Sequence, residues 1–114
     1  MFDFEKLTVY QKSKSYNKKV DELIKNYKLE RGTKDQLKRA SFSIMLNIAE
    51  GTGRFTNPDK RNFYVIARGS VFECVAIFDY LKDLKVISHA EFDDFYATLE
   101  ELSKILFALI KGLK

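Results

Sequence analysis

Large apolar residues recur every three or four positions along most of the chain, and this helical spacing restricts the fold more than any other feature. The clearest stripe lies near the C-terminus, where seven such residues follow one another: Phe92, Phe95, Leu99, Leu102, Leu106, Leu109 and Leu113. The sequence has five glycines and one proline, too few turn-forming residues for a sandwich or barrel of many short strands. The spacing therefore predicts an all-α protein.

The second predicted helix covers residues 34–50 and is apolar on almost every side between Phe42 and Ala49. Thr33 and Gln36 before it match a capping box, in which two side chains satisfy free N–H groups at a helix start. The helix is expected to end on two glycines, Gly51 and Gly53, because glycine adopts the left-handed conformation in which many helices stop. A helix of this composition belongs at the centre of a core or is buried on two sides.

The first helix is expected over residues 8–28 and the third over residues 58–84. Asn57 is a favourable N-cap residue, and Pro58 suits a first helical turn, where its missing N–H costs nothing. The third helix carries two neighbouring apolar stripes, one of Phe63, Ala67, Ser70, Cys74, Ile77, Leu81 and Leu84, and one of Tyr64, Val71, Phe72, Val75 and Phe78.

The fourth helix is expected over residues 89–112, because Ser88 and Glu91 form a second capping-box pattern. Short connections between long helices favour one domain over residues 1–114, an up-down-up-down antiparallel four-helix bundle. The third and fourth helices carry more apolar surface than a single bundle can bury. Because large exposed apolar patches are rare on monomers, we expect a homo-oligomer.

Composition excludes several classes of protein. Hydrophobic residues make up 46% of the chain, enough for a packed core, so global disorder is excluded. Cys74 is the only cysteine, so no intrachain disulfide framework is present. The N-terminal segment lacks the apolar region of a signal peptide, and no stretch approaches about 18 uncharged apolar residues. We expect a cytoplasmic protein without a membrane partner.

The residues that usually carry chemistry are scarce. A di-iron bundle needs Glu-x-x-His pairs on two helices, and His89 is the only histidine. One cysteine and one histidine cannot supply a zinc site, so we expect no metal and no cofactor. Cys74 lies on an apolar stripe, as expected of an inert core thiol. These features indicate a protein that is not an enzyme, with no catalytic residue.

Positive charge is concentrated in the first half of the chain. Residues 1–61 hold 14 Lys and Arg against 8 Asp and Glu, whereas residues 62–114 hold 6 against 8. A basic half is typical of a surface that binds a polyanion, and equally of a lysine-rich helix facing solvent. Few aromatic residues accompany these cations, so phosphate contacts to structured RNA suit them better than base stacking. The candidate nucleic-acid-binding residues are Lys14, Lys18, Lys25, Lys28, Arg31, Lys34, Arg54, Lys60 and Arg61.

A polar stripe runs through the apolar second helix: Arg39, Ser43, Asn47, Glu50 and Arg54 recur at steps of three and four. Pairing the second and third helices as a hairpin places Arg39 opposite Glu73 and predicts an ion pair between them. The same pairing sets Ser43 opposite Gly69 and Ser70.

Two interpretations of this stripe remain open. In the structural one, Asn47 and Glu50 hold the loop at residues 52–57 through hydrogen bonds, and Gly69 is kept for close helix packing, since glycine within a helix costs about 1 kcal/mol. In the functional one, Asn47, Glu50, Arg54 and Arg68 form a pocket for a ligand or RNA at one end of the bundle.

Several of these segments together resemble a known family. The runs 36–44 and 47–54, followed by 66–73, are similar to the bacterial four-helix-bundle proteins encoded in intervening sequences of 23S rRNA genes, and residues 4–12 resemble the start of that family. Met45 and Leu46 stand where a proline is frequent in the family. The matching signature positions are Arg39, Asn47, Glu50, Gly51, Arg54, Arg68, Gly69, Ser70 and Glu73.

The resemblance implies a ring-like assembly, a homopentamer, as in the related accessory variability determinant of diversity-generating retroelements. It also implies a role associated with RNA or the ribosome, inferred from where the genes lie. Two hypotheses follow: an oligomeric RNA-binding protein that contacts phosphates through basic surfaces, and an adaptor or assembly module whose ring docks another protein.

Overall fold

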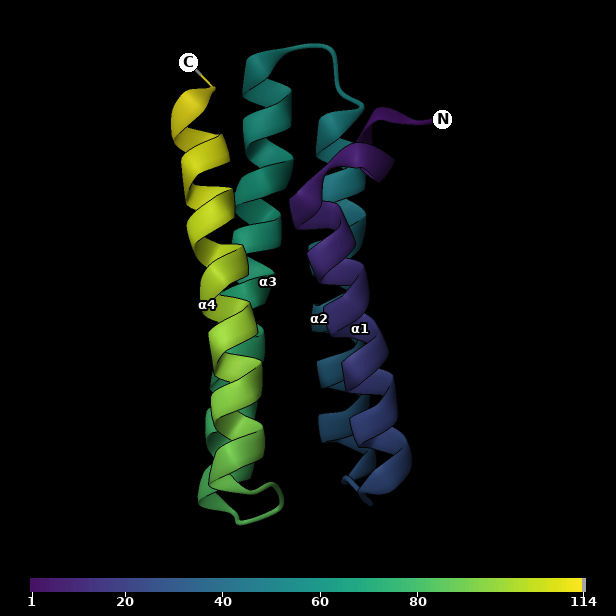
Figure 1. The fold of residues 1–114 in the computed structure, drawn as a ribbon, viewed down its shortest axis with the longest axis vertical. Coiled ribbons are helices and arrows are strands. Elements are labelled where there is room, and N and C mark those ends of the chain that lie inside the picture. The colour runs from purple at the N-terminus through teal and green to yellow at the C-terminus, as the bar shows by residue number, and fades with distance from the viewer. Residues whose placement is uncertain (114) are drawn as a thin grey trace.

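The computed structural model describes residues 1–113, and its regular structure is entirely helical. A short 3-10 helix, η1 (Asp3–Lys6), precedes four long helices: α1 (Thr8–Asn26), α2 (Arg31–Thr52), α3 (Asn57–Asp83) and α4 (His89–Gly112). The long helices lie side by side along the 43 Å axis, with both termini at the same end (Figure 1). The prediction of a four-helix, all-α fold is confirmed.

The helices contact one another in a closed order around the bundle. Contacts join α1 to α2, α2 to α3, α3 to α4 and α4 back to α1. The pair α1–α2 and the pair α3–α4 therefore form opposite sides of the molecule, as Figure 1 shows. The outer surface of each side belongs to a different pair of helices.

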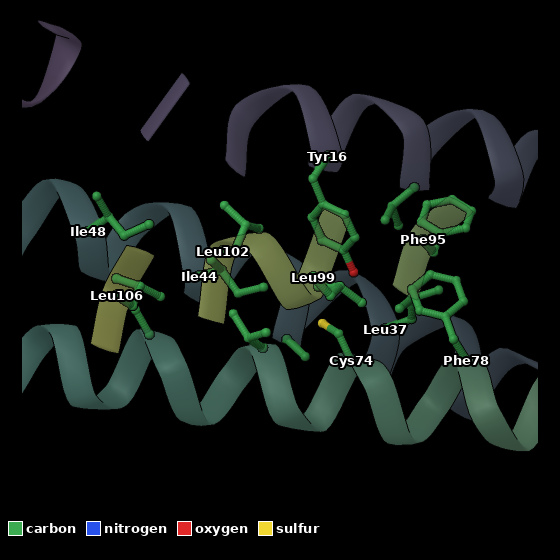
Figure 2. Packing of buried hydrophobic residues seen from close by; sticks show 14 of the residues in the cluster. Tyr16, Leu37, Ile44, Ile48, Cys74, Phe78, Phe95, Leu99, Leu102 and Leu106 are labelled. Carbon is green, nitrogen blue, oxygen red and sulfur yellow. The ribbon is translucent and has the colours of Figure 1, made fainter. Parts of the chain in front are cut away.

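The core is built from one stripe of each helix (Figure 2). The largest side chains with less than 2% of their surface exposed include Tyr16, Leu37, Phe78 and Leu99. In α3 the buried positions come from both predicted stripes: Tyr64, Ala67, Val71, Cys74, Phe78 and Leu81. The centre of the buried face thus falls between the two stripes, and residues on their outer edges reach solvent.

The ends of α2 differ from the prediction. The helix begins at Arg31 after Glu30, which makes no side-chain capping bond, so the expected Thr33–Gln36 capping box is wrong. It continues to Thr52, and Gly53 has a φ of −83° rather than a left-handed value. Helical hydrogen bonds therefore extend past both predicted ends. The terminal turns of α2 gain these hydrogen bonds, and the helix ends at Gly53 without a left-handed glycine conformation.

The starts of α3 and α4 and the end of α1 lie close to the predicted residues. The Ser88 hydroxyl accepts a hydrogen bond from Glu91 N at 3.1 Å while Glu91 Oε1 accepts one from Ser88 N at 2.9 Å, which confirms that capping box. The N-cap of α3 is Thr56 rather than Asn57, since the Thr56 hydroxyl accepts a bond from Asp59 N. The first helix ends at Asn26, two residues before the predicted end.

Glycine lies at the close approach of α2 and α3, but at a different position from the predicted one. A Cβ added to Gly51 would lie 2.9 Å from Phe63 Cβ and 3.0 Å from Tyr64 Cε1. Around Gly69, no atom of residues 1–113 outside its own stretch of helix backbone lies within 4 Å of the same position, so the packing role assigned to Gly69 is wrong. Gly51, expected as a helix end, is the residue that allows the two helices to meet.

Candidate functional site

The outward side of α1 carries a row of exposed lysines, opposite its buried stripe. Lys14, Lys18 and Lys25 are exposed, and none of them forms an ion pair within residues 1–113. Lys14 lies 5.8 Å from the centre of the Tyr10 ring. Because these exposed ammonium groups form no ion pair in the described part of the chain, they can contact an anion outside it.

Two other lysines of α1 have a structural role instead. Lys12 pairs with Glu101 at 3.1 Å and Lys19 pairs with Asp94 at 3.4 Å, both across the contact with α4. The lysines of α1 therefore divide into a set that faces α4 and the outward row that the sequence singled out.

The outward row continues to the end of the bundle away from the termini. Lys28, Arg31 and Lys34 surround the connection from α1 to α2; Lys28 and Arg31 are exposed and Lys34 is half-buried. The exposed carboxylates of Asp21 and Glu22 lie within this stretch of α1 and reduce its net charge. Six predicted cations thus form a basic border along α1 and around its C-terminal end, interrupted by these carboxylates.

The remaining three predicted cations lie at the opposite end of the bundle and bind their own chain. Arg61 donates from Nε and Nη2 to the carbonyl oxygen of Leu113, at 2.9 and 2.5 Å. Lys60 Nζ donates to Thr52 O at 2.8 Å. These cations satisfy free carbonyl groups at the C-terminal ends of α4 and α2. The predicted nucleic-acid-binding residues therefore occupy two separate surfaces.

Arg54 joins this second group at the tip between α2 and α3. Its guanidinium lies 4.5 Å from the centre of the Phe63 ring and pairs with Glu50 at 3.4 Å. Glu50 thus reaches the loop through an ion pair. The neighbouring Phe55 side chain is fully exposed.

Within the polar stripe of α2, Ser43 meets α3 as predicted, but the partners of the other stripe residues differ. Ser70 Oγ donates to Ser43 Oγ at 2.8 Å, which confirms the predicted register of the two helices. Asn47 Nδ2 donates to the carbonyl and hydroxyl oxygens of Ser43, at 2.8 and 3.0 Å. The prediction that Asn47 holds the 52–57 loop is wrong, because its amide is directed back along α2.

The predicted ion pair between Arg39 and Glu73 is also wrong. Gln36 lies between them: Arg39 Nη2 donates to Gln36 Oε1 at 2.8 Å, and Gln36 Nε2 donates to Glu73 Oε2. Arg39 and Gln36 are exposed, so water solvates the guanidinium and no buried charge requires a direct partner.

Arg68 lies on another side of α3 from this stripe. Its guanidinium is 4.8 Å from the centre of the Phe72 ring and 5.4 Å from that of Phe107, and its Nε donates to Ser103 O at 3.4 Å. Arg68 therefore faces α4, whereas Ser43 and Ser70 meet between α2 and α3. The structure does not bring Arg68 together with Asn47, Glu50 and Arg54 into one pocket.

A buried row of three polar side chains was not predicted from the sequence. Tyr16 OH lies 3.1 Å from Ser41 Oγ, which lies 3.6 Å from Cys74 Sγ. Burial raises the pKa values of both the Tyr16 hydroxyl and the Cys74 thiol. The thiol is therefore neutral and enclosed, which confirms its prediction as a core cysteine. The sequence indicates this buried polar row only through Ser41, which lies at the helical spacing of the buried residues of α2.

Within residues 1–113, His, Cys, Asp and Glu side chains nowhere gather in threes in a way that could hold a metal ion. None of the described helices has the length and hydropathy to cross a bilayer.

These features define the class: a four-helix bundle with a basic border on α1 and a polar seam between α2 and α3. Residues 5–108 match the family model of the 23S rRNA-intervening sequence protein, and the chain belongs to this family. The expected resemblance is confirmed.

Solved structures show the same fold. A protein with unknown function of the S23 ribosomal protein family from Bacteroides thetaiotaomicron superposes with a TM-score of 0.86 at 22% sequence identity. The similarity covers 91% of this chain and 99% of that one. At this identity the likeness shows a shared fold. A search among curated proteins found no significant match.

Proposed function

We propose that this protein is a non-enzymatic, cytoplasmic homo-oligomer, a ring-like homopentamer of up-down-up-down antiparallel bundles, that binds structured RNA through phosphate contacts. The observation that carries the proposal is the outward row of α1, where Lys14, Lys18 and Lys25 have no carboxylate partner within residues 1–113. Membership of a family named for 23S rRNA intervening sequences supports RNA as the polyanion.

The proposed binding surface includes only some of the nine predicted cations. Lys60 and Arg61 are half-buried and already donate to backbone carbonyl groups, so fewer of their N–H groups are available to a phosphate. Lys28, Arg31 and Lys34 extend the α1 row around one end of the bundle. The proposed interface is therefore the α1 side with its C-terminal end, rather than the tip between α2 and α3.

The row consists of flexible ammonium groups with few aromatic neighbours, Tyr10 being the exception. Such groups contact phosphates without reading base sequence, and the affinity falls steeply with salt as counterions are released. The proposal therefore predicts binding to folded RNA that depends on ionic strength and depends little on sequence.

A filter-binding titration with a structured RNA at about 50 mM salt, where phosphate contacts are strongest, tests the proposal. The variant Lys18→Glu, Lys25→Glu should bind at least ten-fold more weakly than the wild type. A matched control, Lys104→Glu, Lys111→Glu, makes the same change of charge on α4 and should keep most of the affinity. Wild-type protein without affinity at this salt, or equal losses in both variants, would refute the α1 surface.

A protein–protein adaptor is the second candidate function, and exposed apolar side chains on α3 favour it. Val65, Phe72 and Tyr80 are each at least half exposed on that helix. Oligomeric wild-type protein that fails to bind RNA at low salt would leave the adaptor as the better hypothesis.

A further inference from the structure

A hollow of about 610 Å³ lies between side chains of α1 and α2, and we call it the α1–α2 hollow. Its volume falls within the roughly 300–1,000 Å³ of sites that hold a small molecule. Val20, Phe42 and Leu46 are the apolar residues of its lining, and the Phe42 side chain is 55% exposed. Within residues 1–113 no other ring and no cation stacks on Phe42. An aromatic side chain is thus available to a flat ligand.

Two cations of the lining are also available to a ligand. Lys38 and Arg39 are exposed, and neither forms an ion pair within residues 1–113. Arg39 donates to the neutral amide of Gln36, at 2.8 Å. The carboxylate of the lining, Asp21, is exposed and has no ion pair in the same part of the chain. A phosphate can therefore bind Lys38 and Arg39 without breaking an existing ion pair.

Two asparagine side chains of the lining are held in place by hydrogen bonds to the bundle. Asn17 Nδ2 donates at 2.9 Å to two backbone carbonyl groups, and Asn47 Nδ2 donates to Ser43 O and Oγ at 2.8 and 3.0 Å. Because these bonds use the amide nitrogens, each Oδ1 atom remains as an acceptor. Together with the carboxylate of Asp21, the α1–α2 hollow offers acceptors to the N–H groups of a ligand.

We propose that the α1–α2 hollow binds one unpaired nucleotide of a folded RNA. The base stacks on Phe42, its amino group donates to the amide and carboxylate oxygens of the lining, and the adjoining phosphate contacts Lys38 and Arg39. Proteins recognise unpaired RNA bases by this combination of aromatic stacking and hydrogen bonds to the base edge. The inference rests on the proposed function and adds a base-selective site to its phosphate-binding surface.

The position of the hollow beside the outward row of α1 favours RNA as the occupant. Asp21 lies three residues after Lys18 and four before Lys25, so the three side chains share one side of α1. An RNA whose phosphates contact this row therefore passes along the edge of the α1–α2 hollow. The cations, the aromatic ring and the acceptors of the lining match the phosphate, the flat base and the amino group of a single nucleotide.

Three RNA hairpins with the same stem test the site: one fully paired, one with a single unpaired adenine and one with a single unpaired uracil. Wild-type protein should bind the adenine hairpin at least about five-fold more tightly than the paired one, the gain expected from stacking one base on an aromatic side chain. The uracil hairpin should bind more weakly than the adenine hairpin, because uracil has no amino group to donate.

Phe42→Ala should abolish the preference for the unpaired adenine while the affinity for the paired hairpin stays near that of the wild type. Phe55→Ala is the matched control, because Phe55 is fully exposed and lies outside the hollow. If any exposed ring could hold the base, losing Phe55 would also weaken the preference, whereas we expect this variant to keep it. Since both side chains are more than half exposed, both variants should unfold near the wild-type midpoint.

The outcomes separate this inference from the proposed function. Wild-type protein that binds none of the hairpins at about 50 mM salt refutes the proposed function, and this site with it. Equal affinity for the three hairpins, or a Phe42→Ala variant that keeps the preference, refutes the site alone. Equal affinity for the adenine and uracil hairpins overturns the role of the acceptors. A change in the mass of the assembly on Phe42→Ala, measured by light scattering, would show that another copy covers the hollow and would also overturn the inference.

Discussion

The Ser70 hydroxyl donates a hydrogen bond to the Ser43 hydroxyl at 2.8 Å, and this contact marks the register between α2 and α3. Two turns further along α2, the same register brings Gly51 against Phe63 and Tyr64. Thr52 Oγ1 then lies 2.8 Å from Tyr64 OH. The signature segments of the two helices therefore meet in one seam, which positions the loop between them.

Gly51→Ala should destabilise the protein, whereas Gly69→Ala should stabilise it. The added methyl at Gly51 falls 2.9 Å from Phe63 Cβ and forces α2 and α3 apart, a strain of about 1–3 kcal/mol that exceeds the gain in helix propensity. The methyl at Gly69 meets nothing within 4 Å and gains about 0.5–1 kcal/mol. Urea denaturation of both variants measures the difference, and changes of the same sign would contradict the seam.

Glu73→Gln should change the free energy of unfolding by less than about 1 kcal/mol, because the carboxylate accepts from Gln36 on an exposed surface instead of forming a buried ion pair. A loss of several kcal/mol, as for a broken buried pair, would show that the bridge through Gln36 is wrong. The denaturation midpoint of the variant against wild type provides the measurement.

How far the sequence predicts this structure depends on where the partners of each residue lie. Helical spacing and the Ser88–Glu91 box predicted α4 closely, because these signals are local. The two stripes of α3 left its buried face undecided, since apolar residues cover more than half of its circumference. The centre of the core then depends on how α2 and α4 pack against that helix.

In the candidate site too, some features follow from local spacing and others depend on contacts that form only in the folded bundle. An outward lysine row on α1 follows from the buried spacing of Val9, Tyr16 and Val20 on its other side. The bond from Arg61 to Leu113 could not be predicted, because 52 residues separate the partners and only the folded bundle brings them together. The hairpin register placed Arg39 opposite Glu73, but register alone does not show that the Gln36 side chain lies between them.

Stability should fall in acid partly through Glu91. Its carboxylate accepts hydrogen bonds from Ser88 N and from Tyr27 OH, and these bonds lower its pKa below the usual 4.5. A depressed folded-state pKa contributes stability that is complete above the unfolded value and is lost as pH falls through the folded one. The advantage of wild type over Glu91→Gln should therefore shrink as pH is lowered from 6 to about 3. Parallel stability curves for the two proteins over this range would contradict the assignment.

Cys74 should react with thiol reagents only when the protein opens. Its side chain has no exposed surface, and burial raises the pKa of the thiol, so the reactive thiolate is both rare and enclosed in the native state. At pH 8 the rate of labelling should be at least 100-fold lower in native protein than in urea-unfolded protein. Ser41→Ala removes the hydroxyl neighbour of the sulfur without opening the core, so native protection should persist in that variant. Rapid labelling of the native wild type would show that α3 does not hold Cys74 inside the bundle as described.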